Sequence, residues 1–325
     1  MNDQLTLKFW GVRGSHPTPG MGTVKYGGNT ACVEVRAGTR TIILDAGTGI
    51  IPLGRELVRR ARAEGSALEP VIFVSHLHHD HTQGFPFFVP AYLPNARLTL
   101  FGPGASDDAL ARVLDSNQSP PTFPVGLREM AASKTIRSLR ETDAVVIGEK
   151  EVTITGADPK SGEVSVRIMR SYAHPGGVYV YRIEWRGRSI VYATDTEGYV
   201  GTDRKLVAFA RGADVLIHDA QYSSEHYNGQ LAGFPPTQGY GHSTAEMACE
   251  VASAAGAGRL VLFHHEPAYS DETIASIEAG ARAKFPNTVA AYEGLTLPAL
   301  APSPLPLSAS LKEGNGKAVQ YAQNG

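Results

Sequence analysis

Residues 71–81 read VIFVSHLHHDH, and this stretch decides the fold. Its first four residues are apolar and mostly β-branched, which is typical of a strand buried on both faces of a sheet. The polar residues begin where this strand ends, and open α/β sheets place their ligand sites at such strand ends. We therefore expect a functional site at the carboxyl end of the strand Val71–Val74.

Four side chains in the same stretch are suited to binding metal ions. They are the three imidazoles and one carboxylate of His76, His78, Asp80 and His81, and such donors suit zinc, manganese or iron. His76 and His78 share one side of an extended segment, whereas Asp80 and His81 can face a second ion. The alternative is a solvated polar loop, but four donors directly after a buried strand favour metal binding. In this interpretation His79 is a bystander.

Composition bounds the class of protein. The chain has 325 residues, 30 Lys+Arg, 32 Asp+Glu and a formal net charge of -2, so it lacks the overall positive charge of a dedicated nucleic-acid binder. Its two cysteines, Cys32 and Cys249, lie far apart, which excludes a disulfide-stapled scaffold. The start, MNDQLTLKFW, does not resemble a secretory signal, and no window holds the roughly 20 apolar residues of a membrane span. We expect a cytoplasmic protein with no membrane segment.

Short β-branched runs and helical patterns alternate along the chain, which predicts a layered α/β domain with mixed sheets over residues 1–298. Two stretches interrupt this rhythm. Residues 116–126, SNQSPPTFPVG, hold three prolines, so the surrounding 104–140 is either a flap over a site or a long surface excursion. Residues 299–325 are rich in Pro, Ser, Ala and Gly, which predicts a disordered tail.

The motif His76-Leu77-His78-His79-Asp80-His81 resembles the HxHxDH signature of the metallo-β-lactamase superfamily. The resemblance extends over about residues 5–298. It implies an αββα sandwich, in which two mixed β-sheets are flanked by helices, and a dinuclear metal site. The motif is specific for the superfamily but says much less about the substrate.

The resemblance implies three further ligands, each at or near the end of an apolar strand. His174, in SYAHPGG, resembles the third histidine of the first metal site. Asp195, in VYATDTEG, resembles the carboxylate that bridges both ions. His264, in RLVLFHHEP, resembles the last ligand of the second metal, with His265 as its rival.

Other residues around these strand ends are assigned to supporting or structural roles. Asp45, after TIIL, resembles a superfamily carboxylate that orients a ligating histidine, and Asp219 is a second candidate for such a role. The Gly47–Gly49 segment is interpreted as a tight turn under the metals, since no Walker lysine follows it. The remaining histidines are taken as structural: His16, His218 and His226.

Two ions roughly 3.5–4 Å apart share one water and lower its pKa, which produces a hydroxide nucleophile bridging the metals. Hydrolysis is therefore the expected chemistry. Phosphoesters, carboxylic esters, thioesters, lactones and β-lactams are all attacked on this platform, so the metals alone do not select the substrate.

The segment GHSTAE around His242 selects between these substrates. Ser243 and Glu246 form a capping-box pattern that predicts a helix over Ala245–Ala254, and an anion is favourably placed at a helix N-terminus. GHST…LVLFHHEP, FWGVRGSHPTPG and YGGNTACVEV resemble ribonuclease Z and related phosphodiesterases. This implies that His242 contacts the phosphate as general acid. The candidate catalytic residues are His242 and Asp80. The alternative for His242 is a structural role, in which it merely adjoins the helix.

The chain departs from ribonuclease Z in having no comparable basic, glycine-rich arm for tRNA, so a small or compact phosphodiester is favoured over long RNA. Two divalent ions are expected as cofactors, zinc first, with Mn²⁺ or Fe²⁺ as alternatives. A homodimer is a further expectation from similar enzymes. The alternatives are a carboxylic ester or lactone hydrolase at the same metals, redox chemistry at iron, and a metal-containing regulatory protein without turnover.

Overall fold

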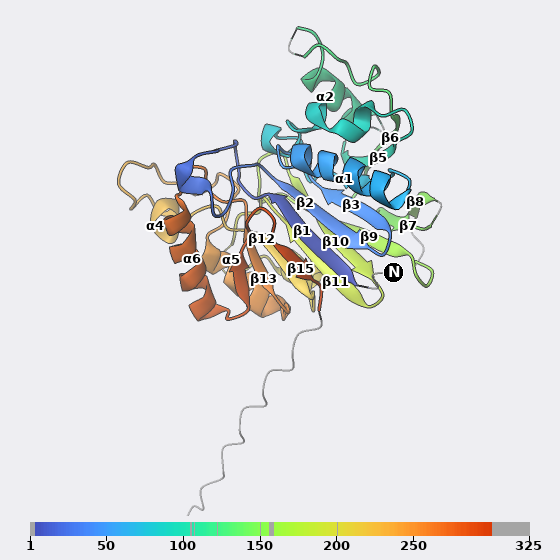
Figure 1. Cartoon of the computed structure of the whole chain (residues 1–325). Helices are drawn as coiled ribbons and strands as arrows, with labels where there is room; N and C mark the ends of the chain where they lie inside the picture. The colour runs from blue at the N-terminus through green and yellow to red at the C-terminus, as the bar shows by residue number, and fades with distance from the viewer. Residues whose placement is uncertain are drawn as a thin grey trace, which may run out of the picture.

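The computed structural model describes residues 4–300, except 105, 107, 122, 150, 156–158 and 200. In this part of the chain two β-sheets pack face to face, and helices cover their outer faces (Figure 1). The first sheet has the spatial order β15 (Thr296–Pro298), β1 (Leu5–Gly11), β2 (Cys32–Ala37), β3 (Arg40–Leu44), β4 (Val71–Phe73), β5 (Arg97–Pro103) and β6 (Ser133–Leu139). The second has the order β14 (Thr288–Ala290), β13 (Leu260–Phe263), β12 (Val215–Asp219), β11 (Arg188–Ala193), β10 (Val178–Trp185), β9 (Val164–Ser171), β7 (Ala144–Ile147) and β8 (Val152–Thr155).

Three apolar layers hold the sandwich together. Leu5, Leu7 and Phe9 alternate along β1 and enter the core between the sheets. The helices on the first sheet are α1 (Ile50–Glu64) and α2 (Ala109–Asn117). Those on the second are α3 (Arg204–Ala210), α5 (Ala245–Ala255) and α6 (Asp271–Lys284), with the short α4 (Ser224–Tyr227) beside them. This arrangement confirms the predicted αββα sandwich.

Each sheet contains a block of parallel strands, and these blocks position the candidate site. In the first sheet β3 to β6 are parallel, with Leu44 opposite Phe73. In the second, β11 to β14 are parallel, with Asp219 opposite Phe263. Because neighbouring parallel strands end side by side, the residues that follow them are brought to one edge of each sheet.

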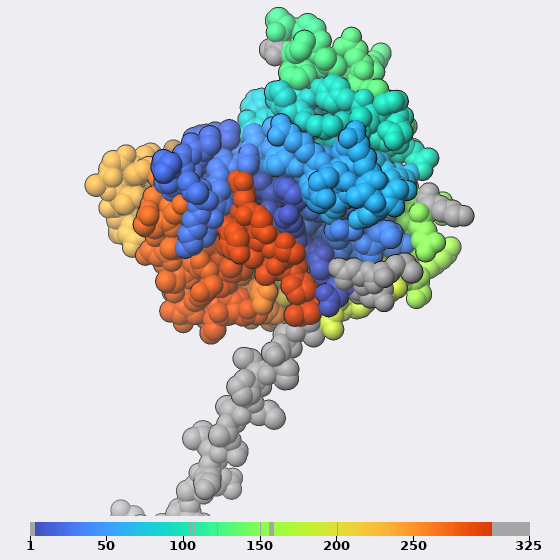
Figure 2. Space-filling view, viewed as in Figure 1, coloured from blue at the N-terminus to red at the C-terminus, as the bar shows by residue number. Residues whose placement is uncertain are grey.

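The segment 104–140 contains a strand that the sequence pattern did not predict. After α2 and the proline-rich loop, β6 pairs in parallel with β5, with Thr135 opposite Thr99. Ser133, Thr135 and Arg137 are exposed on this edge strand, so its hydrophobic pattern is weak. The chain around α2 stands out from the body of the molecule (Figure 2), and a role as a flap stays a prediction.

The end of the described chain is held to the first sheet. The Ala299 amide donates to the Leu5 carbonyl at 2.8 Å, and Ala299 is buried. Residues 301–325 of the predicted tail lie outside the described residues. Among the helices that the structure describes, none is both long and apolar enough to cross a membrane.

Candidate metal centre

A first cluster joins histidines from the two sheets. His76 and His78 follow β4, His174 lies between β9 and β10, and their ligand nitrogens lie within 4.8 Å of one another. His174 Nε2 lies 3.0 Å from His78 Nδ1, and its Nδ1 lies 3.1 Å from the Gly241 carbonyl, which it reaches as a donor. Burial lowers the pKa of His76 and of His174. Both rings are therefore neutral near pH 7, which is the state that binds metal.

A second cluster contains Asp80, His81, Asp195 and His264, all buried, with ligand atoms again within 4.8 Å. Asp80 Oδ2 lies 3.2 Å from His81 Nε2 and 3.1 Å from His264 Nε2, and it accepts from the Ser15 amide at 2.8 Å. Burial disfavours charge on His81, but the surrounding carboxylates outweigh burial and raise its pKa in the metal-free protein.

The Asp195 carboxylate lies between the two clusters. Its Oδ1 is 3.6 Å from His76 Nε2 and 3.8 Å from His174 Nε2. Its Oδ2 is 3.2 Å from His81 Nε2 and 3.4 Å from His264 Nε2. Each oxygen thus faces a different cluster, which is the arrangement that a bridging carboxylate requires.

One unpartnered nitrogen in the first cluster indicates that these residues fit a bound metal. His76 Nε2 is buried, faces the Asp195 carboxylate and has no hydrogen-bond partner. A buried polar atom without a partner is costly unless something else satisfies it. Imidazole nitrogens and carboxylate oxygens are the ligands that zinc accepts, so a divalent ion in each cluster would satisfy the residues that are present.

Asp45 connects the first sheet to the second cluster. Its Oδ2 lies 2.7 Å from His81 Nδ1 and accepts from the Tyr192 hydroxyl at 2.6 Å, while its Oδ1 accepts from the Ser75 amide at 2.6 Å. These bonds fix the orientation of His81 and leave its Nε2 facing the cluster. A carboxylate in this position can orient His81, and the orienting role implied by the sequence resemblance stays a prediction.

Asp45→Asn is expected to weaken zinc binding by about 10- to 100-fold, because outer partners of ligating histidines have effects of that size. The measurement is competition for Zn²⁺ against a chromophoric chelator, with thermal denaturation to confirm folding. Asp214→Asn is the matched control, since Asp214 is also buried but accepts from Ser189 and Arg188 at the opposite end of β11. An unchanged zinc affinity in Asp45→Asn would contradict the orienting role.

Three of the site residues leave their strands in a left-handed backbone conformation. Asp45, Asp195 and His264 have φ values of 64°, 52° and 64°. Non-glycine residues rarely adopt this region, although Asp and His tolerate it better than most. Such positions persist where the surrounding structure enforces them, and they concentrate at functional sites.

Asp219 and His242 form a pair beside both clusters. His242 Nδ1 lies 2.8 Å from Asp219 Oδ2, and the Ser243 amide donates to Asp219 Oδ1 at 2.8 Å. The His242 ring stacks on His264 with a centroid distance of 5.0 Å. Burial opposes a charge on His242, but Asp219 outweighs it and raises the pKa of His242 to about 9 in the metal-free protein.

The capping-box prediction at this helix was wrong by one residue. Thr244, not Ser243, caps α5, and its hydroxyl accepts from the Met247 amide at 3.3 Å. Ser243 is unavailable because its hydroxyl donates to the Thr196 carbonyl and its amide donates to Asp219. His242 is therefore held by Asp219 rather than by the helix cap.

The structure separates the two adjacent histidines after β13. His264 lies in the second cluster, whereas His265 Nε2 lies 2.9 Å from the Ala291 carbonyl, to which it donates, on the other side of the turn. The other histidines lie outside both clusters: His16 and His79 are exposed, His226 pairs with Tyr269, and His218 bonds the Asp219 carbonyl.

Two supporting residues were missed by the sequence analysis. Glu197 accepts from the amides of Gly239 and Gly241 at 2.7 and 2.9 Å, and so fixes the loop that precedes His242. Gln221 Oε1 lies 3.1 Å from His264 Nδ1 and accepts from it. Each lies two residues beyond a predicted strand-end aspartate, and this spacing is the only local signal for them.

Glycines allow two loops to approach the clusters closely. A Cβ at Gly47 would lie 2.2 Å from the Asp80 carbonyl oxygen, which agrees with the predicted turn under the metals. Gly241 has a φ of 91°, and a Cβ there would lie 2.4 Å from His174 Nδ1. Larger residues at either position would displace the ligands.

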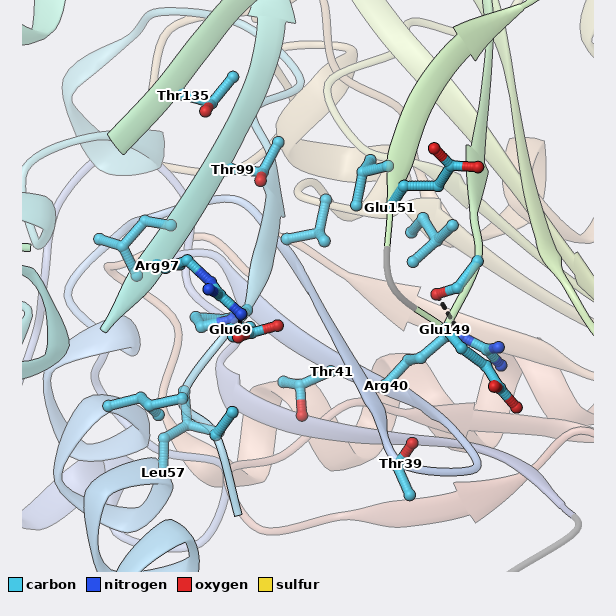
Figure 3. A pocket seen from close by; sticks show the side chains of 18 of the residues that line it. Thr39, Arg40, Thr41, Leu57, Glu69, Arg97, Thr99, Thr135, Glu149 and Glu151 are labelled. Atoms are coloured by element: carbon cyan, nitrogen blue, oxygen red, sulfur yellow. Dashed lines mark hydrogen bonds and ion pairs between the residues drawn. The ribbon is translucent and has the colours of Figure 1, made fainter. Parts of the chain in front are cut away.

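A hollow of about 1000 Å³ lies away from both clusters. Figure 3 shows Thr41, Arg97, Thr99 and Thr135 around it, and these residues belong to the amino ends of β3, β5 and β6. The metal clusters lie at the carboxyl ends of the parallel strands, so this hollow is at the opposite end of the sheet. None of the predicted site residues lines it.

An αββα sandwich that gathers histidines and aspartates at the carboxyl ends of its parallel strands defines the class of metallo-β-lactamase-fold proteins. The family model described as "Beta-lactamase superfamily domain" matches residues 40–265. The chain belongs to this superfamily.

Relatives and solved structures agree with this assignment. The chain is 28% identical over 311 residues to the ribonuclease Z of Picrophilus torridus, covering 86% of this chain and 91% of the relative. It shares its fold with the metallo-β-lactamase fold protein YhfI from Bacillus subtilis, at a TM-score of 0.63 and 16% identity, covering 91% of this chain and 100% of that one. A diphosphatase of the PhnP family matches with a TM-score of 0.58 at 18% identity, covering 90% and 97%.

Proposed function

We propose that this metal-dependent hydrolase is a phosphodiesterase that holds two divalent ions. His76, His78, His174 and Asp195 would hold one ion, and Asp80, His81, Asp195 and His264 the other. When bound, the ions activate water for hydrolysis and neutralise charge on the phosphate oxygens. The observation that carries the proposal is the Asp219–His242 pair, which lies beside both clusters.

The pair supports phosphodiester chemistry because it keeps a proton donor next to an anionic substrate. Asp219 Oδ2 lies 2.8 Å from Nδ1 of His242 and fixes the ring, so that Nε2 is the nitrogen that can reach a substrate. A positively charged imidazole attracts a phosphate group and donates a proton to the departing oxygen. Asp219 thus positions His242 as general acid.

The comparisons support the same reaction class. Curated relatives from Picrophilus torridus and Thermoplasma acidophilum are named ribonuclease Z, and one structural neighbour is described as a diphosphatase. With a net charge of -2 on this chain, a compact phosphodiester is the better substrate, since long nucleic acids are held through many Lys and Arg contacts.

Zinc is the proposed metal. The neighbour PqqB from Methylobacterium extorquens, with a TM-score of 0.60 at 17% identity over 90% of this chain, is described as Zn²⁺-bound. The mixture of imidazole and carboxylate donors in the clusters suits zinc, and it also suits manganese or iron. Metal analysis of the purified protein, followed by reconstitution with each ion, distinguishes them.

The reaction class is tested on the metal-reconstituted protein with bis(p-nitrophenyl) phosphate, p-nitrophenyl acetate and a lactone. We expect kcat/KM for the phosphodiester to exceed that for the carboxylic ester by at least about tenfold, which corresponds to an activation free energy lower by ~1.4 kcal/mol. Faster turnover of the ester or lactone would assign the alternative hydrolase. Full metal loading without turnover of any substrate would assign a non-catalytic protein.

A further inference from the structure

A second hollow, of about 650 Å³, lies directly against the first metal cluster. His174 forms part of its wall, and His174 groups with His76 and His78 in that cluster. Its other lining residues include Glu197 and Tyr199 in the loop that follows β11, and Gly239 in the loop that precedes His242. A group attached to a phosphate at the metals would therefore enter this hollow.

Two tyrosines line the hollow with their rings largely uncovered. Tyr172 is 71% exposed and Tyr199 is 52% exposed. The Arg170 guanidinium lies 4.9 Å from the centroid of the Tyr172 ring, and it also donates to the Gly176 carbonyl at 3.3 Å. This cation–π contact supports the ring from one side. An exposed ring supported in this way provides a flat apolar surface on which another planar group can stack.

The remaining walls leave room for a flat group. Gly176 and Gly239 both line the hollow, and a Cβ built on either would meet nothing within 4 Å. Peptide backbone without side chains therefore forms a smooth part of the wall. The volume lies within the usual range for pockets that hold small molecules.

The charges around the hollow select an uncharged group over a second phosphate. Among the described residues that line it there is no lysine or arginine. Its one carboxylate, Glu197, is already occupied: Oε1 accepts from the Tyr227 hydroxyl at 2.6 Å, and Oε2 accepts from the Gly241 amide at 2.9 Å. The Arg170 guanidinium lies against the Tyr172 ring and is not among the lining residues. A polyphosphate or a run of nucleotide backbone would therefore meet few counter-charges here, whereas an aromatic ring needs none.

We propose that this hollow binds the base of a nucleoside phosphodiester, stacked on Tyr172 or Tyr199 while the phosphate lies at the metal clusters. The inference rests on the proposed phosphodiesterase function and names its substrate class. Stacking of a base on an aromatic side chain tolerates different bases, since each base has a flat π-face. The hollow thus selects for a base without specifying which one.

The test compares two phosphates that differ only in the base, thymidine 5′-monophosphate and 2-deoxyribose 5-phosphate, by calorimetric titration of the metal-loaded protein. We expect the base-bearing phosphate to bind about 5- to 150-fold more tightly, the range typical of one base–aromatic stack. At least one of the variants Tyr172→Ala and Tyr199→Ala should reduce that ratio and leave the affinity for 2-deoxyribose 5-phosphate unchanged. A ratio unchanged in both would overturn the inference. Tyr172→Phe and Tyr199→Phe keep the ring and should keep the ratio. Tyr292→Ala, at an exposed tyrosine outside the hollow, is the control.

Equal affinities of the wild-type protein for the two phosphates would overturn the inference. Equal losses of both phosphates in the alanine variants would also overturn it, because they would indicate a general disturbance of the metal cluster. Turnover of bis(p-nitrophenyl) phosphate is measured on the same samples. A protein that discriminates the base but hydrolyses no phosphodiester would refute the proposed function and retain the base site.

Discussion

Asp195→Ala is expected to lower kcat/KM for bis(p-nitrophenyl) phosphate by about 10³-fold or more, since metal ions supply several kcal/mol of transition-state stabilisation. Bound metal should fall from the proposed two ions per chain to one or none. The physical reason is that the two oxygens of Asp195 face different clusters: Oδ1 faces His76 and Oδ2 faces His81. Removing it takes one donor from each cluster.

Asp214→Ala is the control for the loss of a buried carboxylate. Asp214 is 5% exposed but bonds Ser189 and Arg188, at the other end of the strands. This variant should unfold at a lower temperature and keep its metal, whereas Asp195→Ala should lose metal. Atomic absorption and thermal denaturation on both proteins provide the comparison. Two ions and normal turnover in Asp195→Ala would show that Asp195 does not bridge.

His242→Ala is expected to reduce kcat for a phosphodiester with a poor, alkyl leaving group by about 10²- to 10⁴-fold, the usual contribution of a positioned general acid. Hydrolysis of p-nitrophenyl acetate should change little, because nitrophenolate in a carboxylic ester needs no protonation to depart. A poor leaving group should suffer more than nitrophenolate in the phosphodiester series. Rates are measured for alkyl and nitrophenyl phosphodiesters on metal-loaded protein.

The metal content of His242→Ala separates two roles for this residue. Asp195, Asp219, His242 and His264 also form a group with ligand atoms within 4.8 Å, so His242 as a ligand is the competing interpretation. Unchanged metal content with slow phosphodiester turnover supports the general acid. Loss of an ion would assign His242 to coordination instead. His79→Ala, at an exposed histidine in the same loop as the ligands, should behave as wild type.

The strand-end residues named from the sequence come together in the structure, and their signal is local. A buried β-branched run followed by Asp or His marks Asp45, Asp195 and His264 without any knowledge of the tertiary structure. The sandwich itself followed from the motif after β4 and from the alternation of strands and helices. Edge strand β6 was missed because three of its side chains are exposed and polar.

Other features depend on contacts between distant segments and left no local pattern. Ser243 is a residue type that often caps helices, but its amide and hydroxyl are hydrogen-bonded to Asp219 and Thr196. Thr244 therefore caps the helix instead. Glu197 matters because it reaches the amide of Gly241, 44 residues away.

The left-handed backbone at Asp45, Asp195 and His264 limits how far this protein could be stabilised by redesign. Glycine would relax each turn, at sites where a non-glycine residue costs of the order of 1–3 kcal/mol. It would also delete the carboxylate or imidazole that each turn delivers. Selection for thermal resistance and selection for metal binding therefore favour different residues at these positions. A thermostable version would gain its stability elsewhere and keep these three turns as they are.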